Sequence, residues 1–110
     1  MKKVLCVCSM GINRSPTLAR VLCMKSYNYD TRSCGTDAGS LIPLTRMLLR
    51  WADVVVCAEK YHWNKVKKLL NKIHIEIPIY TLHIPDRYEY NSLELIRLIE
   101  LKLIENSFND

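Results

Sequence analysis

The sequence predicts an α/β fold: a single-domain, three-layer α/β/α arrangement in which helices cover both faces of a four-stranded parallel sheet. Short apolar runs alternate with amphipathic segments, a pattern typical of consecutive β–α–β units. The chain has 110 residues, the usual length of one domain, and 49% of them are hydrophobic, enough to fill a modest single core. We therefore expect residues 1–110 to form one domain.

The first predicted strand and helix lie close to the start of the chain. Residues 4–7 form a short apolar, partly β-branched run, which indicates a buried strand. A helix is expected from Ser15 to about residue 26, because serine is a favoured N-cap and Pro16 suits the first helical position. Helical spacing puts these residues on its inner side: Leu18, Val21, Leu22 and Cys23.

The next two elements give weaker signals. Residues 31–36 are a strand candidate, which Gly35 and Gly39 end. Residues 43–52 are expected to be helical. The predicted apolar face of that helix carries Leu44, Met47, Leu48 and Trp51.

The second half of the chain repeats the alternation. Residues 54–58 are the clearest strand, and residues 59–72 return to helical spacing. Residues 75–82 are a fourth strand, which Pro78 places at an edge of the sheet. A strongly amphipathic last helix is expected over residues 92–105, capped by Asn91 or Ser92.

Composition excludes some classes and leaves others open. The net charge of +5, from 16 Lys and Arg against 11 Asp and Glu, suits anionic partners, although many small proteins are mildly basic without such a partner. We expect no secretory signal and no membrane span. The five cysteines form no C-x-x-C pair and the three histidines share no ligand spacing, so we expect free thiols and no metal site in a cytoplasmic protein.

The segment CSMGINRSP, residues 8–16, joins the first strand to the first helix. Cys8 stands at the carboxyl end of the strand, where parallel sheets bind their ligands. The loop can turn successive backbone N–H groups toward one anion, and the start of the helix adds its own. This arrangement predicts a phosphate-binding loop. Its expected binding residues are Ser9, Met10, Gly11, Ile12, Asn13 and Arg14.

Individual residues of this loop suit nucleophilic chemistry on an anion. Gly11 can take a positive φ, which a tight nest of N–H groups usually requires. Arg14 offers a planar fork for two phosphate oxygens. The same donors would stabilise a thiolate, and the Ser15 hydroxyl could donate a further hydrogen bond to the sulfur. We therefore expect Cys8 to act as a nucleophile.

The segment VLCVCSMGINRSPTLARVL, residues 4–22, resembles the opening of the low-molecular-weight protein tyrosine phosphatases and their C-x5-R-S-P loop. It is most similar to a short branch of predicted tyrosine phosphatases. The family pattern reads Cys-Leu-Gly-Asn-Ile-Cys-Arg-Ser-Pro. Positions that match it are Cys8, Ile12, Arg14, Ser15 and Pro16.

Two departures change what the resemblance implies. Gly11 stands where the family has asparagine, and it tolerates the same left-handed backbone. Asn13 stands where the family has a second cysteine, so the resemblance does not extend to protection of the nucleophile by a disulfide.

The resemblance also implies a general acid near the C-terminus. The family uses an aspartate in an Asp-Pro-Tyr loop, and the matching stretch here is Ile-Pro-Asp-Arg-Tyr at residues 84–88. It implies that Asp86 is the acid and that Tyr88 flanks the substrate ring. Asp37 is a weaker candidate for the acid. Because the segment 37–44 looks shorter than its family counterpart, Tyr88 remains the obvious wall, and we expect a shallow site.

The activity that the resemblance implies is that of a cysteine-dependent phosphomonoester hydrolase. It would be a metal-independent protein tyrosine phosphatase that works through a phosphocysteine and needs no cofactor. Its substrates would be phosphotyrosine-containing proteins or aryl phosphates. No nucleic acid or membrane partner is expected, and the protein would be a monomer or a weak homodimer.

Four alternatives remain open at this stage. An Ssu72-like phosphoserine phosphatase is similar at Asn13-Arg14-Ser15 but belongs to much longer chains. An arsenate reductase would need a further cysteine where Asn64 stands. A phospho-carrier of the sugar-transport IIB type does not require Arg14. A non-catalytic phosphate or phosphopeptide binder would not need Cys8, Arg14 and Asp86 together.

Overall fold

Strands and helices alternate along the chain, as the sequence predicts. The computed structural model describes residues 2–24, 27–106 and 108. The elements in these ranges are β1 (Lys3–Cys8), α1 (Arg14–Cys23), β2 (Asp30–Gly35), α2 (Arg46–Trp51), β3 (Val54–Cys57), α3 (Lys60–Lys72), β4 (Ile79–Thr81) and α4 (Leu93–Glu105). None of the described helices combines the length and the apolar character that crossing a bilayer requires.

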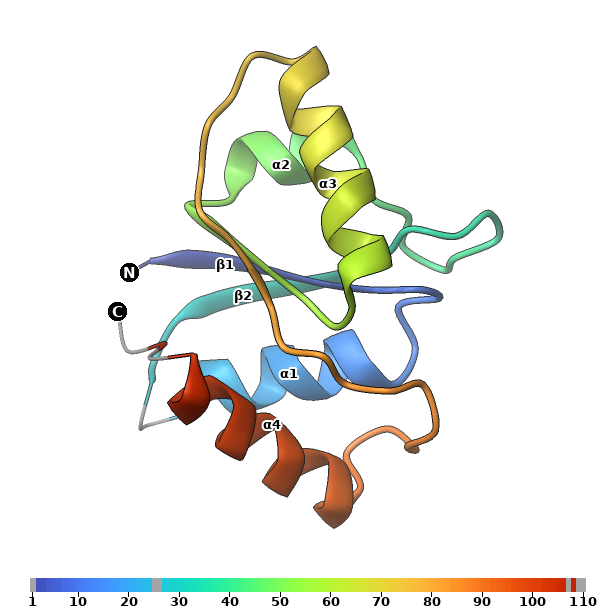
Figure 1. Ribbon diagram of the computed structural model, residues 1–110, viewed down its shortest axis with the longest axis vertical. Helices are drawn as coiled ribbons and strands as arrows, with labels where there is room; N and C mark the ends of the chain where they lie inside the picture. Colours follow the sequence, from blue (N-terminus) through green and yellow to red (C-terminus); the bar gives the residue numbers. More distant parts are fainter. Residues whose placement is uncertain (1, 25–26, 107, 109–110) are drawn as a thin grey trace.

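The strands form one parallel sheet in the order β2-β1-β3-β4. Helices α1 and α4 cover one face, and α2 and α3 cover the other (Figure 1). The three-layer α/β/α prediction is therefore confirmed. Because all strands run the same way, their carboxyl ends meet at one edge, and β1 is central, so the loop after β1 opens at the middle of that edge.

The residues of β1 alternate between two apolar cores. Val4 and Cys6 face α1 and α4, where Leu22 and Ile99 are fully buried. Leu5 and Val7 face α2 and α3. A strand buried on both faces has no polar side, which is why residues 4–7 read as an unbroken apolar run.

Helix α1 begins two residues earlier than predicted, at Arg14 instead of Pro16. Asn13 is its N-cap and makes no side-chain cap hydrogen bond, so the expectation that Ser15 caps the helix is wrong. Ser15 and Pro16 lie in the first turn, where proline is tolerated because its missing N–H has no helical acceptor. Ser15 is buried, and its hydroxyl donates to the Cys34 carbonyl oxygen at 3.1 Å. Its side chain thus links α1 to β2.

The helix also ends earlier, at Cys23, and the predicted continuation to residue 26 reaches positions outside the described residues. The prediction that Cys23 is a core residue is wrong, because its side chain is exposed. Cys34 and Cys57 are buried, as predicted.

Helix α2 is shorter than the predicted 43–52. Pro43 instead forms an isolated bridge with Gly35, and the helix begins only after Thr45, whose hydroxyl oxygen accepts the Leu48 N–H at 3.2 Å. Leu49 is the buried residue of this helix. Met47 is 80% exposed, which corrects its assignment to the apolar face.

Strand β4 lies at the edge of the sheet, as Pro78 predicted, but it is shorter than residues 75–82. The Pro78 carbonyl oxygen accepts the Val55 N–H. Because Pro78 directly precedes the first residue of β4, its missing N–H is tolerated there. Helix α4 begins as predicted, because the Ser92 hydroxyl accepts the Leu95 N–H.

Candidate active site

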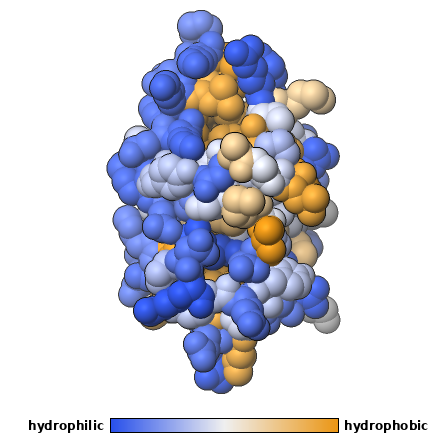
Figure 2. Space-filling view, turned by 90° about the vertical axis from the view of Figure 1, so that its right-hand side faces the viewer, coloured by the Kyte–Doolittle hydropathy of each residue, from blue (hydrophilic) through white to orange (hydrophobic). Residues whose placement is uncertain are grey.

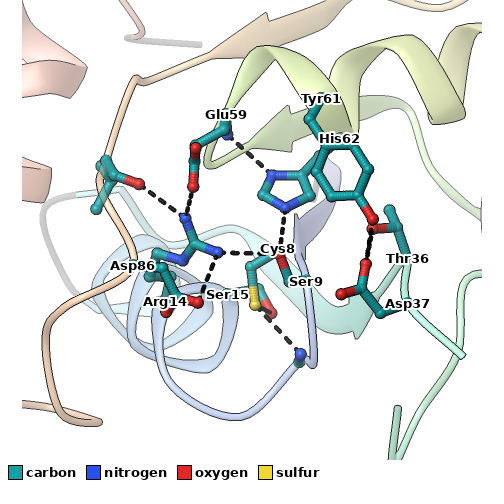
Figure 3. A network of polar contacts seen from close by, with 12 residues as sticks. Cys8, Ser9, Arg14, Ser15, Thr36, Asp37, Glu59, Tyr61, His62 and Asp86 are labelled. Carbon is teal, nitrogen blue, oxygen red and sulfur yellow. Dashed lines mark hydrogen bonds and ion pairs between the residues drawn. The ribbon is translucent and has the colours of Figure 1, made fainter. Parts of the chain in front are cut away.

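The candidate active site lies in the loop 8–14, between β1 and α1. Cys8 ends β1 and is 2% exposed. Its Sγ accepts the Gly11 N–H at 3.2 Å, and its thiol donates to Ser15 Oγ at 3.1 Å. The loop thus curls around the sulfur atom; Figure 3 shows Cys8 and Ser15 side by side inside it.

Gly11 is the residue that lets the loop close. Its φ is +72°, in the left-handed region that favours glycine. A Cβ at this position would lie 3.1 Å from both the Cys34 carbonyl carbon and the Gly35 nitrogen, tighter than an ordinary contact. Glycine is therefore required at position 11 both by the backbone angle and by the close approach of β2.

Arg14 is buried, and both ends of its guanidinium fork are held. Nη1 donates to a carboxylate oxygen of Glu59 and to the Ile84 carbonyl oxygen, the latter at 2.9 Å. Nη2 donates to Ser9 Oγ at 3.2 Å and lies 3.6 Å from Asp86 Oδ2 (Figure 3). The loops after β1, β3 and β4 therefore meet at one cation.

A pocket of about 130 Å³ opens beside this arginine. Its lining residues are Cys8, Met10, Ile12, Asn13, Arg14 and Asp86. Thiol, guanidinium and carboxyl group thus face one small cavity at the start of α1, where helical N–H groups favour an anion. The arrangement can bind a compact oxyanion and expose it to the sulfur.

The sequence-predicted residues that do not line the pocket are Ser9, Gly11, Ser15, Asp37 and Tyr88. Ser9 does not line the pocket; its hydroxyl stands behind Arg14. Tyr88 lines a separate depression at the start of α4. Asp37, the weaker acid candidate, is not a lining residue either, and it accepts a hydrogen bond from the Tyr61 hydroxyl. That hydrogen bond lowers the pKa of the Asp37 carboxyl.

Sequence reasoning missed two residues of the site, Glu59 and His62. Glu59 follows β3 and binds Arg14; His62, in the first turn of α3, is fully buried and contacts Ser9 Oγ through Nε2 at 2.9 Å. A signal was present, because Glu-x-x-His directly follows a strand whose carboxyl end must lie beside that of β1.

Burial shifts the pKa values of two thiols and one imidazole in this region away from their ordinary values. Desolvation raises the pKa of Cys34 to about 12 and that of Cys6 well above its usual range, so these thiols stay protonated. Burial and the Arg14 charge lower the pKa of His62 to about 4, so its ring is neutral at neutral pH.

The arrangement of elements is that of known proteins. A low-molecular-weight protein tyrosine phosphatase from Streptococcus pyogenes superposes with a TM-score of 0.70 at 19% identity, over 96% of this chain and 90% of that one. The chain has the low-molecular-weight phosphatase fold. This phosphatase fold also serves the YwlE arginine phosphatase from Geobacillus stearothermophilus, which has a TM-score of 0.65 at 18% identity, over 97% and 93% of the two chains.

A phosphotransferase component resembles the chain less well. The lactose-specific IIB domain from Streptococcus pneumoniae superposes with a TM-score of 0.52 at 16% identity, over 98% of this chain and 96% of that domain. No protein-family model matches the chain, and no curated protein sequence is significantly similar to it.

Proposed function

We propose that the protein is a cysteine-dependent phosphomonoester hydrolase, acting on phosphotyrosine or similar aryl phosphates through a phosphocysteine intermediate. The observation that carries the proposal is the convergence of Cys8, Arg14 and Asp86 on one pocket at the start of α1. A binder needs the arginine and the backbone donors. A nucleophile and a carboxyl group beside them suit turnover.

The first step would transfer the phosphoryl group to sulfur. The Cys8 thiolate attacks phosphorus in line, the bond between phosphorus and the phenolic oxygen breaks, and Asp86 gives its proton to that oxygen. Arg14 and the loop N–H groups stabilise the equatorial oxygens, where negative charge develops. Ser15 Oγ, 3.1 Å from Sγ, can donate to the sulfur when it is a thiolate, provided that its one proton turns away from the Cys34 carbonyl oxygen.

The second step would hydrolyse the phosphocysteine. A water molecule attacks phosphorus, Asp86 takes its proton, and the bond between sulfur and phosphorus breaks, returning the thiolate and inorganic phosphate. In the free protein Asp86 Oδ2 lies 3.6 Å from Arg14 Nη2, so the carboxylate already stands at the pocket. No step in this scheme uses a metal ion.

Apolar residues surround the pocket and would contact the substrate's ring. Figure 2 views the edge of the molecule that carries the site, where apolar side chains interrupt a mostly hydrophilic surface. Met10 and Ile12 are exposed and line the pocket themselves. Because Tyr88 lines a different depression, we assign ring contacts to Met10 and Ile12 in its place.

The alternatives differ in what they ask of these residues. A phospho-carrier has no use for Asp86 in the pocket of Cys8, and the IIB domain superposes less closely than the phosphatases do. We propose a phosphotyrosine-containing protein as the partner and a cytoplasmic location, with the protein a monomer or a weak homodimer. Because the same fold serves an arginine phosphatase, substrate choice needs its own measurement.

The test is hydrolysis of p-nitrophenyl phosphate across pH with EDTA present, by the wild type and by Cys8→Ser. Cys23→Ser is the matched control, because Cys23 is exposed and outside the pocket. We expect metal-independent turnover that Cys8→Ser abolishes and Cys23→Ser retains. Turnover that survives in Cys8→Ser, or that EDTA abolishes, would contradict the proposal.

A further inference from the structure

His62 occupies a position that none of the catalytic steps above uses. Its side chain is fully buried at the start of α3, and in Figure 3 it lies beside Ser9 and Glu59, the two residues that also contact Arg14. Both ring nitrogens have partners: the Glu59 N–H lies 3.0 Å from Nδ1, and Ser9 Oγ lies 2.9 Å from Nε2. A buried histidine with two such contacts has a fixed orientation.

The contacts also fix its tautomer. A backbone N–H can only donate, so Nδ1 must accept from Glu59 and carries no proton. The neutral ring therefore has its proton on Nε2, which donates to Ser9 Oγ. Burial and the charge of Arg14 keep the ring neutral, because they lower the pKa of His62 to about 4.

This tautomer determines what Ser9 can do. Ser9 Oγ accepts from His62 Nε2 and also accepts from Arg14 Nη2 at 3.2 Å. Arginine has no acceptor, so the contact with Arg14 exists only while the hydroxyl proton points away from the guanidinium. The donor on His62 supplies that orientation.

We infer that His62 is a positioning residue: its Nε2 proton holds Ser9 as an acceptor for Arg14, and Ser9 in turn sets the orientation of the guanidinium that grips phosphate. The inference deepens the proposed function and rests on it for the role of Arg14. The other ring nitrogen of His62, Nδ1, has a different role. Nδ1 completes the capping box of α3, in which the Glu59 side chain accepts the His62 backbone N–H.

Charged groups reach His62 from several elements. Arg14 comes from α1, Asp37 from the loop after β2, Glu59 from the N-cap of its own helix, and Asp86 from the loop after β4. Arg14 opposes protonation of the ring, whereas the three carboxylates favour it. A single pH titration would mix these groups, so the test uses substitutions at fixed neutral pH.

Two substitutions separate the two nitrogens. His62→Gln puts an amide N–H close to the place of Nε2, so it keeps the donor for Ser9 and loses the acceptor for the Glu59 N–H. His62→Asn puts an amide oxygen close to the place of Nδ1, so it keeps the helix cap and loses the donor. The measurements are the dissociation constant of inorganic phosphate by calorimetry, kcat and KM for p-nitrophenyl phosphate, and the melting temperature.

We expect a crossed result. His62→Gln should lower the melting temperature but keep phosphate affinity within about threefold of the wild type. His62→Asn should keep more of the melting temperature but weaken phosphate binding and kcat/KM by about tenfold or more, the size of effect that a misplaced binding group produces. Ser9→Ala should match His62→Asn, and the double variant should be no worse than either single one.

Other outcomes overturn the inference. If both His62 variants bind phosphate as the wild type does, or if both lose affinity only in proportion to stability, His62 is merely structural. Additive losses in the double variant would also contradict the route through Ser9. If the wild type binds phosphate but shows no turnover, the proposed hydrolase activity is wrong, and the phosphate dissociation constants of the variants still test the role of His62. If the wild type binds no phosphate, both proposals are wrong.

Discussion

Gly11 shows how much of the site depends on a residue that has no side chain. It donates its N–H to Cys8 Sγ while its backbone passes against β2. Gly39 has a similar positive φ, +87°, but a Cβ there would meet nothing within 4 Å. The two glycines therefore form a matched pair, of which only Gly11 combines an unusual backbone angle with close packing.

We expect Gly11→Ala to lower the free energy of unfolding by about 2–4 kcal/mol and Gly39→Ala by about 1 kcal/mol. A left-handed alanine costs about 1–2 kcal/mol in either place, and the crowding at Gly11 adds to this. Urea unfolding measures both variants. Equal losses of unfolding free energy in the two variants would show that β2 shifts without cost to make room for a Cβ at position 11.

Asp86 makes the second prediction at this scale, because its carboxyl group stands at the pocket. Asp86→Asn should lower kcat for phenyl phosphate by ~10²–10⁴-fold, the usual contribution of a positioned acid. The loss should be smaller for p-nitrophenyl phosphate, whose phenolate is a weaker base and leaves without a proton. Steady-state kinetics on both substrates test this, and equal losses would remove Asp86 from the role of acid.

At the scale of elements, the first turn of α3 does more than begin a helix. Its N-cap, Glu59, binds Arg14, and its third residue, His62, is buried against the loop 8–14. The two residues of the capping box that starts α3 thus also hold Arg14, Glu59 directly and His62 through Ser9. Stability of this turn and order in the site are therefore coupled.

That coupling predicts a pH dependence of stability. An unfolded histidine binds its proton near pH 6.5, whereas His62 in the folded protein has a pKa of about 4. The free energy of unfolding should be full above about pH 6.5 and fall by about 3 kcal/mol on the way to pH 4, because the unfolded chain binds the extra proton. Urea unfolding at several pH values should show this fall in the wild type and a smaller one in His62→Gln.

Asp37 contributes in a different window. Its pKa lies below the ordinary value of 3.8, chiefly because Tyr61 donates to it, so its stabilisation is lost only at still lower pH. If His62→Gln falls as steeply as the wild type between pH 6.5 and 4, the imidazole is not the responsible group.

The sequence predicted elements well where one local pattern decides them. The runs of β1 and β3 are buried on both faces, so hydrophobicity alone reveals them. The start of α1 was misplaced because Ser15 uses its hydroxyl on Cys34, a residue of another strand. No local pattern contains that contact.

The same reasoning explains what the sequence revealed of the site. Cys8, Gly11 and Arg14 lie within seven residues of each other, so one segment displays them together. Glu59 contacts Arg14 across a sequence separation of 45 residues, and His62 contacts Ser9 across one of 53. Which residues of the first turn of α3 point at the loop depends on where that helix begins, and this is set by tertiary packing.

At the scale of the whole molecule, two apolar cores share one sheet. Ile99, a residue of α4, is fully buried in the core on one side of the sheet, and Leu49 is fully buried in the core on the other side. Both tryptophans, Trp51 and Trp63, pack on the side of Leu49. Alternate residues of β1 belong to the two cores. Loss of packing in one core therefore disturbs β1, and through β1 the other core.

We therefore expect the two layers to unfold together. Ile99→Ala should lower the free energy of unfolding by about 2–5 kcal/mol, as truncation of a buried aliphatic side chain does. Its tryptophan fluorescence and far-ultraviolet circular dichroism should shift to the same new urea midpoint. Leu49→Ala is the matched control on the tryptophan side. A fluorescence midpoint that stays at the wild-type value in Ile99→Ala would show that the layers are independent.

The position of Cys23 has a practical consequence for chemical labelling. Four of the five thiols are buried, and Cys23 alone stands exposed, on α1. A fluorophore or spin label attached under mild conditions is expected to react at Cys23, whereas Cys8 is reached only through the pocket that it lines. Alkylating inhibitors will react there as well, so a reagent's stoichiometry must be read on a Cys23→Ser background before any loss of function is credited to Cys8.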